Sequence, residues 1–168
     1  ASELGVGSQF SVRLPLHRVH SDTADASGAA GLAAATVLLV EPNPLGRGVM
    51  KAALSGQVSA LEITGSVSEA LESLGSRRFD MLLVEGRALP AAPSDAAAAL
   101  GSLAAIAAGA KVVVLWAGAP EDACSLHKAG AQLVVQKPIG TADLVRELEA
   151  LSLEEQPAAS GARSARRR

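Results

Sequence analysis

The chain has a single cysteine, no tyrosine, no excess of one charge and no long apolar run. Because Cys124 stands alone, an internal disulfide is excluded; this suits a reducing cytoplasm, and we expect a small buried residue there. Fifteen basic residues oppose seventeen acidic ones, so the net charge provides no field that attracts nucleic acid or an anionic membrane. No apolar run reaches the roughly 20 residues that span a bilayer, and the first residues lack the pattern of a signal peptide. We therefore expect a soluble, cytoplasmic chain whose partners are recognised locally.

A length of 168 residues, with 49% apolar and 19% charged residues, has room for one globular domain with a sizeable core. Residues 17–34 are mostly small or polar and have no apolar period, so we predict a flexible linker. Residues 154–168 lack large apolar side chains and end in a basic cluster, which predicts a disordered tail. The folded domain should occupy residues 35–153.

Short apolar runs alternate with helical patterns in that domain, which is typical of a parallel sheet covered on both faces. We predict strands at residues 37–40, 60–64, 81–84, 112–115 and 132–135. Helices are predicted at residues 44–54, 66–74, 94–108 and 120–129, with a last one from Thr141, and Ser66 and Ser94 are candidate N-caps. Right-handed crossovers give an α/β, flavodoxin-like (βα)5 three-layer sandwich with strand order 2-1-3-4-5. Ligands then belong at the carboxyl ends of the strands.

The residues that follow the central strands form a recognisable constellation: Glu41-Pro42, Glu85, Trp116 and Lys137-Pro138. Their order and spacing resemble the receiver domain of response regulators and hybrid histidine kinases, over residues 35–153. That resemblance implies an acidic pair and an aspartate that hold magnesium, phosphorylation of the aspartate, a hydroxyl that senses it, and a lysine that contacts it.

Only part of the receiver set is present. Glu41 matches the first acid, but Pro42 stands in place of the second, so a magnesium ligand is missing. Glu85 replaces the phosphorylated aspartate, and a shift of about 1 Å in a reacting group can cost roughly 100-fold in rate. Trp116 replaces the hydroxyl and cannot offer its hydrogen bond. We therefore predict a pseudo-receiver without metal, cofactor or enzymatic activity, in which Lys137 pairs with Glu85.

Alternatives remain for three features of this pocket. The Glu85–Lys137 pair either mimics phosphorylation or only stabilises the pocket. Trp116 either fills the pocket as a core aromatic or provides an exposed platform for stacking a base. A residual phospho-acceptor activity of Glu85 is the third alternative, and Pro138 is expected to be structural, after a cis bond.

A second resemblance covers residues 4–16, LGVGSQFSVRLPL. This stretch is similar to the last glycine-rich turn and strand of a histidine-kinase ATP-binding domain, with Phe10 starting the strand. The boxes that bind magnesium and adenine are absent from this chain, so it should neither bind ATP nor phosphorylate a substrate. Residues 1–16 as a kinase remnant, residues 17–34 as a linker and a receiver after them imply a bacterial hybrid histidine kinase as the parent protein, working in a phosphorelay.

The predicted working surface is the one through which receivers usually engage partners, made by the fourth helix, fifth strand and fifth helix. The expected partner is the kinase core or another receiver. In the alternative, the same face binds a second messenger of the cyclic di-GMP type, through positive groups and a stacking residue. The residues assigned to this face are His127, Lys128, Gln132, Lys137, Pro138, Arg146 and Glu149.

Three other patterns have ordinary explanations. His17 and His20 lie three positions apart, but only Asp22 could join them as a ligand, so we expect them to be solvated. Cys124 and His127 have the spacing of a nucleophile and base, yet nothing orients the histidine. The terminal arginines, residues 166–168, are expected to aid solubility.

Overall fold

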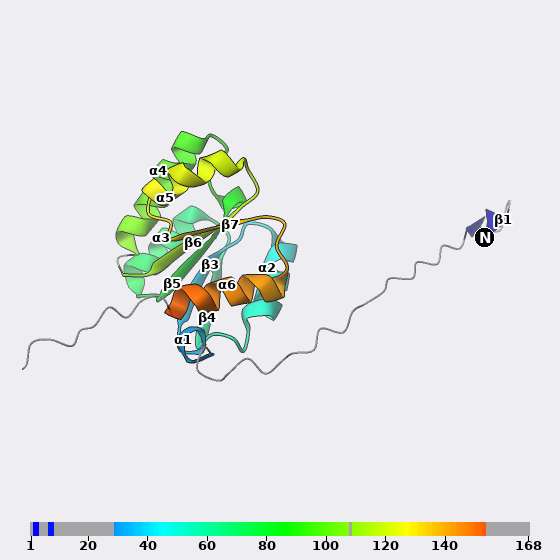
Figure 1. Ribbon diagram of the computed structural model, residues 1–168, viewed down its shortest axis with the longest axis horizontal. Coiled ribbons are helices and arrows are strands. Elements are labelled where there is room, and N and C mark those ends of the chain that lie inside the picture. Colours follow the sequence, from blue (N-terminus) through cyan, green and yellow to red (C-terminus); the bar gives the residue numbers. More distant parts are fainter. Residues whose placement is uncertain (1, 4–6, 9–28, 108, 154–168) are drawn as a thin grey trace, which may run out of the picture.

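The computed structural model describes residues 2–3, 7–8, 29–107 and 109–153 of the chain (Figure 1). Two short strands, β1 (Ser2–Glu3) and β2 (Gly7–Ser8), pair antiparallel. The strand predicted around Phe10, most of the predicted linker with His17 and His20, and the tail at residues 154–168 lie outside the described residues.

A five-stranded parallel sheet forms the centre of the molecule. Its strands are β3 (Thr36–Val40), β4 (Ala60–Thr64), β5 (Met81–Glu85), β6 (Lys111–Trp116) and β7 (Leu133–Gln136). They lie in the order β4-β3-β5-β6-β7. This is the predicted 2-1-3-4-5 order of a flavodoxin-like fold, and the prediction is confirmed.

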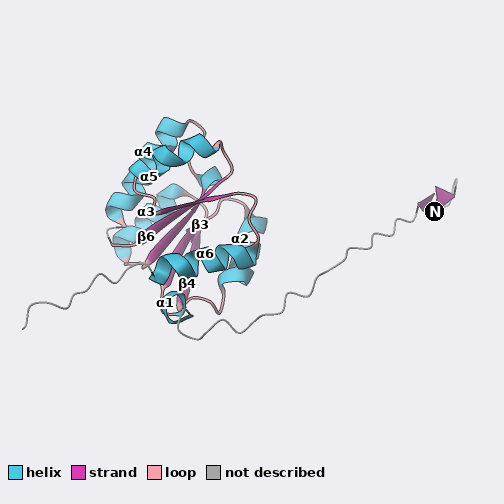
Figure 2. Cartoon of the chain, in the orientation of Figure 1, coloured by secondary structure: helices cyan, strands magenta, loops and turns pink. Residues whose placement is uncertain are grey.

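Helices cover both faces of the sheet (Figure 2). The apolar cluster on one face joins the sheet to α3 (Val67–Ser76), α4 (Pro93–Ile106) and α5 (Ala123–Lys128). The cluster on the other face joins it to α1 (Ala29–Ala33), α2 (Pro44–Leu54) and α6 (Thr141–Leu153). Successive strand side chains point to opposite faces, so Leu38 lies in the first cluster and Leu39 in the second. Strands β3, β5 and β6 therefore read as continuous apolar runs because both faces are buried.

Helix starts follow local chemistry, with one error in our prediction. Ser66 caps α3 as expected, since its hydroxyl accepts a hydrogen bond from the Glu69 N–H at 3.2 Å. Ser94 is not a cap: α4 begins at Pro93, and Ala92 occupies the cap position. Proline is favoured in the first helical turn because that position needs no N–H donor. The predicted helix at residues 120–129 is divided into the 3₁₀ turn η2 (Pro120–Asp122) and α5.

Helix α1 lies within the segment for which we predicted a flexible linker, so that prediction is wrong for residues 29–33. Leu32 is only 1% exposed and belongs to the same apolar cluster as Leu148 of α6. Burial of one leucine contributes about 1.5–3 kcal/mol, which offsets part of the entropy cost of ordering a short helix. A single large apolar residue among small ones is a weak sequence signal.

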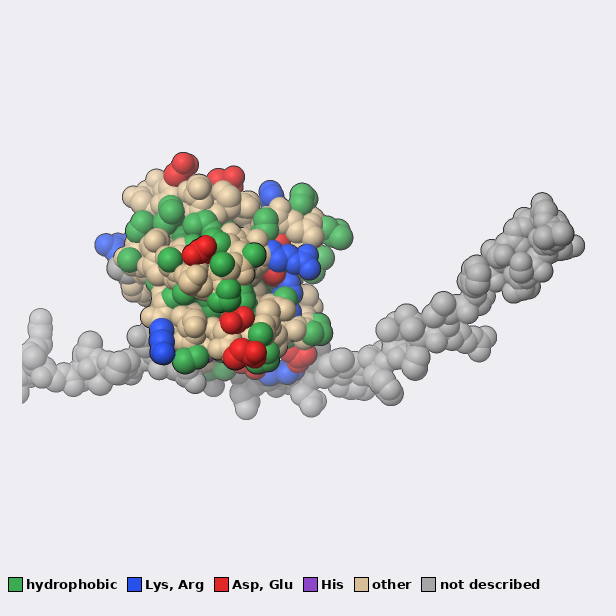
Figure 3. Space-filling model, turned by 90° about the horizontal axis from the view of Figure 1, so that it is seen from above, with side chains coloured by type: hydrophobic (Ala, Val, Ile, Leu, Met, Phe, Trp, Pro, Cys, Tyr) green, Lys and Arg blue, Asp and Glu red, His purple; other side chains and the backbone are tan. Residues whose placement is uncertain are grey.

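Cys124 is exposed, contrary to the expectation of a buried residue. The buried position of α5 is Leu126, and residues two apart on a helix face away from each other. Across the surface seen in Figure 3, acidic and basic side chains are scattered rather than gathered by sign. Among the described residues, no helix has the length and apolar character needed to cross a membrane.

Asp80 ties the start of β3 to the start of β5. Its Oδ2 accepts hydrogen bonds from the Thr36 N–H and the Thr36 hydroxyl, both at 2.7 Å. The backbone hydrogen bond, followed by the hydroxyl, lowers the pKa of Asp80 below its ordinary value, against a smaller opposing effect of burial.

Because the pKa of Asp80 is depressed in the folded state, ionised Asp80 stabilises the fold above the unfolded-state pKa of about 3.9. That stabilisation should disappear as the pH falls through the lower, folded-state pKa. Asp80→Asn should therefore destabilise the protein at pH 7 and much less at pH 2–3, as measured by urea unfolding at each pH. An equal loss at both pH values would contradict the charge-assisted role of these hydrogen bonds.

Candidate functional site

The centre of the candidate site is an ion pair between Glu85 and Lys137. Glu85 ends β5 and Lys137 follows β7, so β6 lies between their strands. Lys137 Nζ lies 2.7 Å from Glu85 Oε2. The Glu85 side chain is 2% exposed and that of Lys137 is 34% exposed. The predicted pairing is therefore present, and it places a carboxylate in the interior with a half-exposed ammonium above it.

The two carboxylate oxygens of Glu85 have different environments. Glu85 Oε1 is buried and has no hydrogen-bond partner among the described residues. A buried unpaired acceptor costs free energy, so the Glu85 carboxylate depends on the single contact with Lys137. The peptide bond between Lys137 and Pro138 is cis.

Glu41 is also buried, at 5% exposure, at the end of β3. Its Oε1 accepts a hydrogen bond from the Asn43 N–H at 2.8 Å. Asn43 in turn caps α2, since its Oδ1 accepts from the Leu45 N–H at 3.0 Å. A Cβ added at Gly46 would lie 2.6 Å from Glu41 Oε2. The Glu41 carboxylate therefore lies against the first turn of α2, in space that only a glycine leaves open.

Arg47 forms hydrogen bonds with the loop that contains Glu41 and Pro42. Its Nε donates to the Glu41 carbonyl oxygen at 2.9 Å, and its Nη2 donates to the Pro42 carbonyl oxygen at 3.1 Å. The guanidinium thus binds the backbone of the loop and leaves the carboxylate to Asn43.

Trp116 fills the space at the end of β6, where its side chain is 7% exposed. Its Nε1 donates to the Ala119 carbonyl oxygen at 3.1 Å. A Cβ at Gly86 or at Gly118 would lie within 2.8 Å of the indole ring. Glycines therefore flank the ring, and Trp116 is a pocket-filling aromatic, not an exposed stacking platform.

These residues do not fit a magnesium ion. The receiver resemblance implies three acidic groups, of which Glu41 and Glu85 remain, while Pro42 has no side-chain oxygen. One oxygen of each remaining carboxylate is engaged, by the Asn43 N–H and by Lys137. Magnesium demands near-octahedral oxygen coordination, and within the described ranges no three His, Cys, Asp or Glu side chains gather in a metal-binding arrangement.

The predicted partner face is divided between the two ends of β7. His127, Lys128 and Gln132 precede the strand, whereas Lys137 and Pro138 follow it. Gln132 has a structural contact, since its Oε1 accepts from the Val112 N–H at 2.5 Å.

The remaining members of this face, Arg146 and Glu149, lie on α6, and Arg146 pairs with Asp143 at 2.8 Å. His127 Nδ1 lies 2.8 Å from the Ala131 carbonyl oxygen. The face is therefore a broad surface and not a single pocket.

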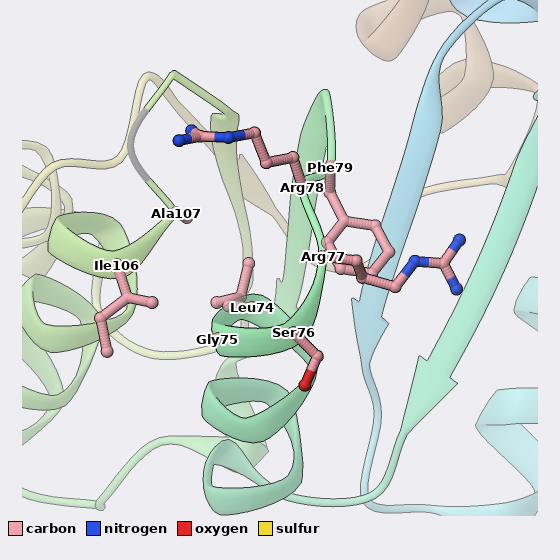
Figure 4. Close-up of a pocket in the computed structure, with 8 residues that line it drawn as sticks. All are labelled: Leu74, Gly75, Ser76, Arg77, Arg78, Phe79, Ile106 and Ala107. Atoms are coloured by element: carbon pink, nitrogen blue, oxygen red, sulfur yellow. The ribbon is translucent and has the colours of Figure 1, made fainter.

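A pocket of about 300 Å³ lies elsewhere, between the carboxyl ends of α3 and α4 (Figure 4). None of the predicted site residues lines it. Arg77 points away toward β4, where it pairs with Glu62 at 2.7 Å. The lining residues are Leu74, Gly75, Ser76, Arg77, Arg78, Phe79, Ile106 and Ala107.

Sequence reasoning missed the four residues that shape the site around the predicted ones. Asn43 had a usable signal, because Asn before Pro is a typical helix start. Gly46, Gly86 and Gly118 had none, since the contacts that exclude a side chain come from residues distant in sequence or from the folded turn.

The packing of Glu41 against α2 can be tested with two glycines of that helix. Gly46→Ala should destabilise the protein by about 1–2 kcal/mol, because the new methyl group overlaps the Glu41 carboxylate. Gly48→Ala is the control: nothing lies within 4 Å of its added Cβ, so a gain of up to about 1 kcal/mol is expected from helix propensity. Urea unfolding measures both, and equal effects would show that Glu41 is not confined by the helix.

Solved receiver domains are similar to this chain in structure. The receiver domain of a sensor histidine kinase from Pseudomonas aeruginosa PAO1, solved with magnesium in its active-site cleft, is 28% identical with a TM-score of 0.58, and the match covers 71% of this chain and 98% of that one. A CheY-like receiver domain from Methanospirillum hungatei JF-1 is 19% identical with a TM-score of 0.62, over 71% of this chain and 94% of that one.

The fold also occurs in other contexts. A pilus assembly protein from Caulobacter crescentus CB15 is 21% identical with a TM-score of 0.60, over 72% of this chain and 95% of that one. No family model matches the chain, and no curated protein resembles it significantly in sequence. The folded part of the chain therefore has the fold of CheY-like receiver domains.

Proposed function

We propose that this receiver domain is not phosphorylated in the ordinary way and regulates a hybrid sensor histidine kinase by docking onto protein partners. The observation that carries the proposal is the ion pair of 2.7 Å between Lys137 and the buried Glu85. The acidic side chain at the acceptor position is already neutralised by the lysine that would otherwise contact a phosphoryl group.

Two further departures support the absence of phosphorylation. Pro42 removes an acidic ligand, so the metal that would neutralise an incoming phosphoryl group lacks its site. Trp116, bonded to Ala119 and flanked by glycines, occupies the position of the sensing hydroxyl. A bulky ring held in this way has no second position to adopt on phosphorylation.

The proposed partner is the kinase core or another receiver of the same system. It is expected to contact the α5, β7 and α6 face, including the exposed Lys128 and Arg146 and the partly exposed Glu149. The kinase-like sequence at residues 4–16 supports the hybrid kinase as the parent, and an exposed free thiol at Cys124 suits its cytoplasmic side.

Binding of a cyclic dinucleotide is the second candidate function. Its phosphates would need arginine or lysine, and Lys128 and Arg146 lie on the proposed face. Burial of Trp116 removes the aromatic platform that this candidate required, and Lys137 is engaged by Glu85. Protein docking therefore has the stronger support.

The test is a two-dimensional NMR spectrum of the ¹⁵N-labelled chain, titrated with magnesium and beryllofluoride and separately with cyclic di-GMP. We expect no shifts at Glu41, Glu85 or Lys137 in the first titration. Shifts there would show a working phosphorylation pocket and overturn the proposal. Shifts on the α5, β7 and α6 face in the second titration would favour the second-messenger function.

Docking is tested in the parent kinase by reversing charges at Lys128, Arg146 and Glu149 together. Kinase autophosphorylation should change by severalfold in either direction, because rim charges govern association and orientation. Reversal of Arg78, which lies outside this face, is the matched control. Unchanged autophosphorylation in the triple variant would remove the docking function from this surface.

A further inference from the structure

Strand β4 forms one edge of the sheet, and in the described part of the chain it pairs only with β3. This edge is the one opposite β7, which contributes to the partner face proposed above. An uncovered edge strand presents a row of main-chain donors and acceptors that another strand can use.

The register of β4 against β3 shows which main-chain groups of β4 point to the open edge of the sheet. The Thr64 carbonyl oxygen accepts a hydrogen bond from the Glu41 N–H at 3.0 Å, so Thr64 turns its backbone toward β3. Because main-chain groups along a strand point alternately to its two sides, Leu61 and Ile63 turn their N–H and C=O groups to the open edge. A strand added here would pair with these two residues.

A groove of about 440 Å³ accompanies the same edge, on the face that carries α2. Val58, Leu61 and Ile63 line it with partly buried apolar side chains. The main-chain groups of an added strand and the side chains on its inner face would thus find hydrogen bonds and an apolar surface together, which is the arrangement used in recognition by strand addition.

Charge on the two faces of β4 indicates what the added strand should contain. Lys51 of α2 lines the groove and is the only charged side chain among the described residues that line it. Helix α2 carries Arg47 and Lys51 and no acidic residue. On the other face of β4, Glu62 is already paired with Arg77 at 2.7 Å. The charge left to be complemented is therefore positive and lies beside the groove.

We propose that the β4 edge binds an extended segment of a partner protein, which adds a sixth strand next to Leu61 and Ile63. The segment carries apolar residues and an acidic residue at alternate positions, so that all of them face the groove and Lys51. This surface goes beyond the docking function proposed above and does not depend on the state of the phosphorylation pocket.

The probe is the acetylated and amidated heptapeptide Thr-Val-Thr-Glu-Thr-Val-Thr, which places two valines and a glutamate on one face of a strand. Titrated into the ¹⁵N-labelled chain, it should shift the amide signals of residues 60–64 and slow hydrogen exchange at Leu61 and Ile63. Lys51→Glu should weaken binding about fivefold, as expected for an exposed charge pair. Arg78→Glu, a change of the same charge at an exposed residue that does not line the groove, should leave binding unaltered.

A second peptide isolates the contribution of the main chain. N-methylation at alternate residues keeps the side chains but prevents strand pairing, so this peptide should not bind. Equal binding of the two peptides, or shifts only outside residues 51–64, would overturn the proposal. So would concentration-dependent shifts of the β4 amides without peptide, since the occupant of the edge would then be a second copy of the chain. Each result is distinct from the outcome of the beryllofluoride titration.

Discussion

Replacing Trp116 with Ala is expected to lower the free energy of unfolding by about 3–5 kcal/mol, the usual cost of removing a large buried aromatic side chain. Trp116 is 7% exposed and belongs to the larger apolar cluster of the core. Gly86 and Gly118 lie against its ring and have no side chains that could move into the space. The cavity should therefore persist, and the full cost should be observed.

Trp116→Phe provides the matched control. It keeps an aromatic ring but loses the hydrogen bond from Nε1 to the Ala119 carbonyl oxygen, so a loss of about 1–2 kcal/mol is expected. Urea unfolding followed by far-UV circular dichroism measures both variants. A loss below about 1 kcal/mol for Trp116→Ala would mean that the loop after β6 closes over the space, contrary to a ring held between glycines.

Replacing Lys137 with Met is expected to cost about 2–3 kcal/mol. The substitution preserves most of the aliphatic length but leaves the Glu85 carboxylate, which is 2% exposed, without the one hydrogen-bond partner it has among the described residues. Loss of the partner of a buried charge is more damaging than loss of an exposed ion pair. This expected loss of stability is smaller than the loss observed when the partner of a fully buried charge is removed. The reason is that the Lys137 side chain is 34% exposed, so water can replace part of its contact.

A double-mutant cycle separates this pair from general packing effects. Glu85→Gln leaves only a half-exposed lysine without its partner and should cost about 1 kcal/mol. The double variant should be more stable than the sum of the two losses predicts, because no buried charge remains. Lys128→Met is the control for loss of an exposed lysine and should be nearly neutral. Additive losses around the cycle would show that the Glu85–Lys137 contact does not stabilise the pocket.

The fold was predictable from sequence because both faces of the central strands are buried. Runs such as residues 81–84 are apolar throughout, and only a sheet covered on two sides requires that pattern. The residues at which helices begin were harder to predict from the sequence. Ser94 was chosen as a cap by residue type, whereas Pro93 determines where α4 begins. Helix α1 depends on one leucine that reaches the core, a contact that no local pattern reveals.

The candidate site was predictable where it depends on strand ends. Glu85 and Lys137 follow strands in the same parallel sheet, so their approach follows from topology alone. The environment of Trp116 was not predictable, since Gly86 and Gly118 matter only through their distances to the ring. The position of Cys124 was judged from its residue type, which says nothing about the face of a short helix on which it lies.

Trp116 also gives the molecule an optical property. It is the only tryptophan, and the chain has no tyrosine, so near-ultraviolet absorption and fluorescence emission both come almost entirely from this indole. Since the ring is buried against Gly86 and Gly118, its emission should be shifted to the blue in the folded protein and move to the red on unfolding. The same signal would respond to any ligand that contacts the loop after β6, so the protein carries its own spectroscopic probe where a receiver usually carries its switch.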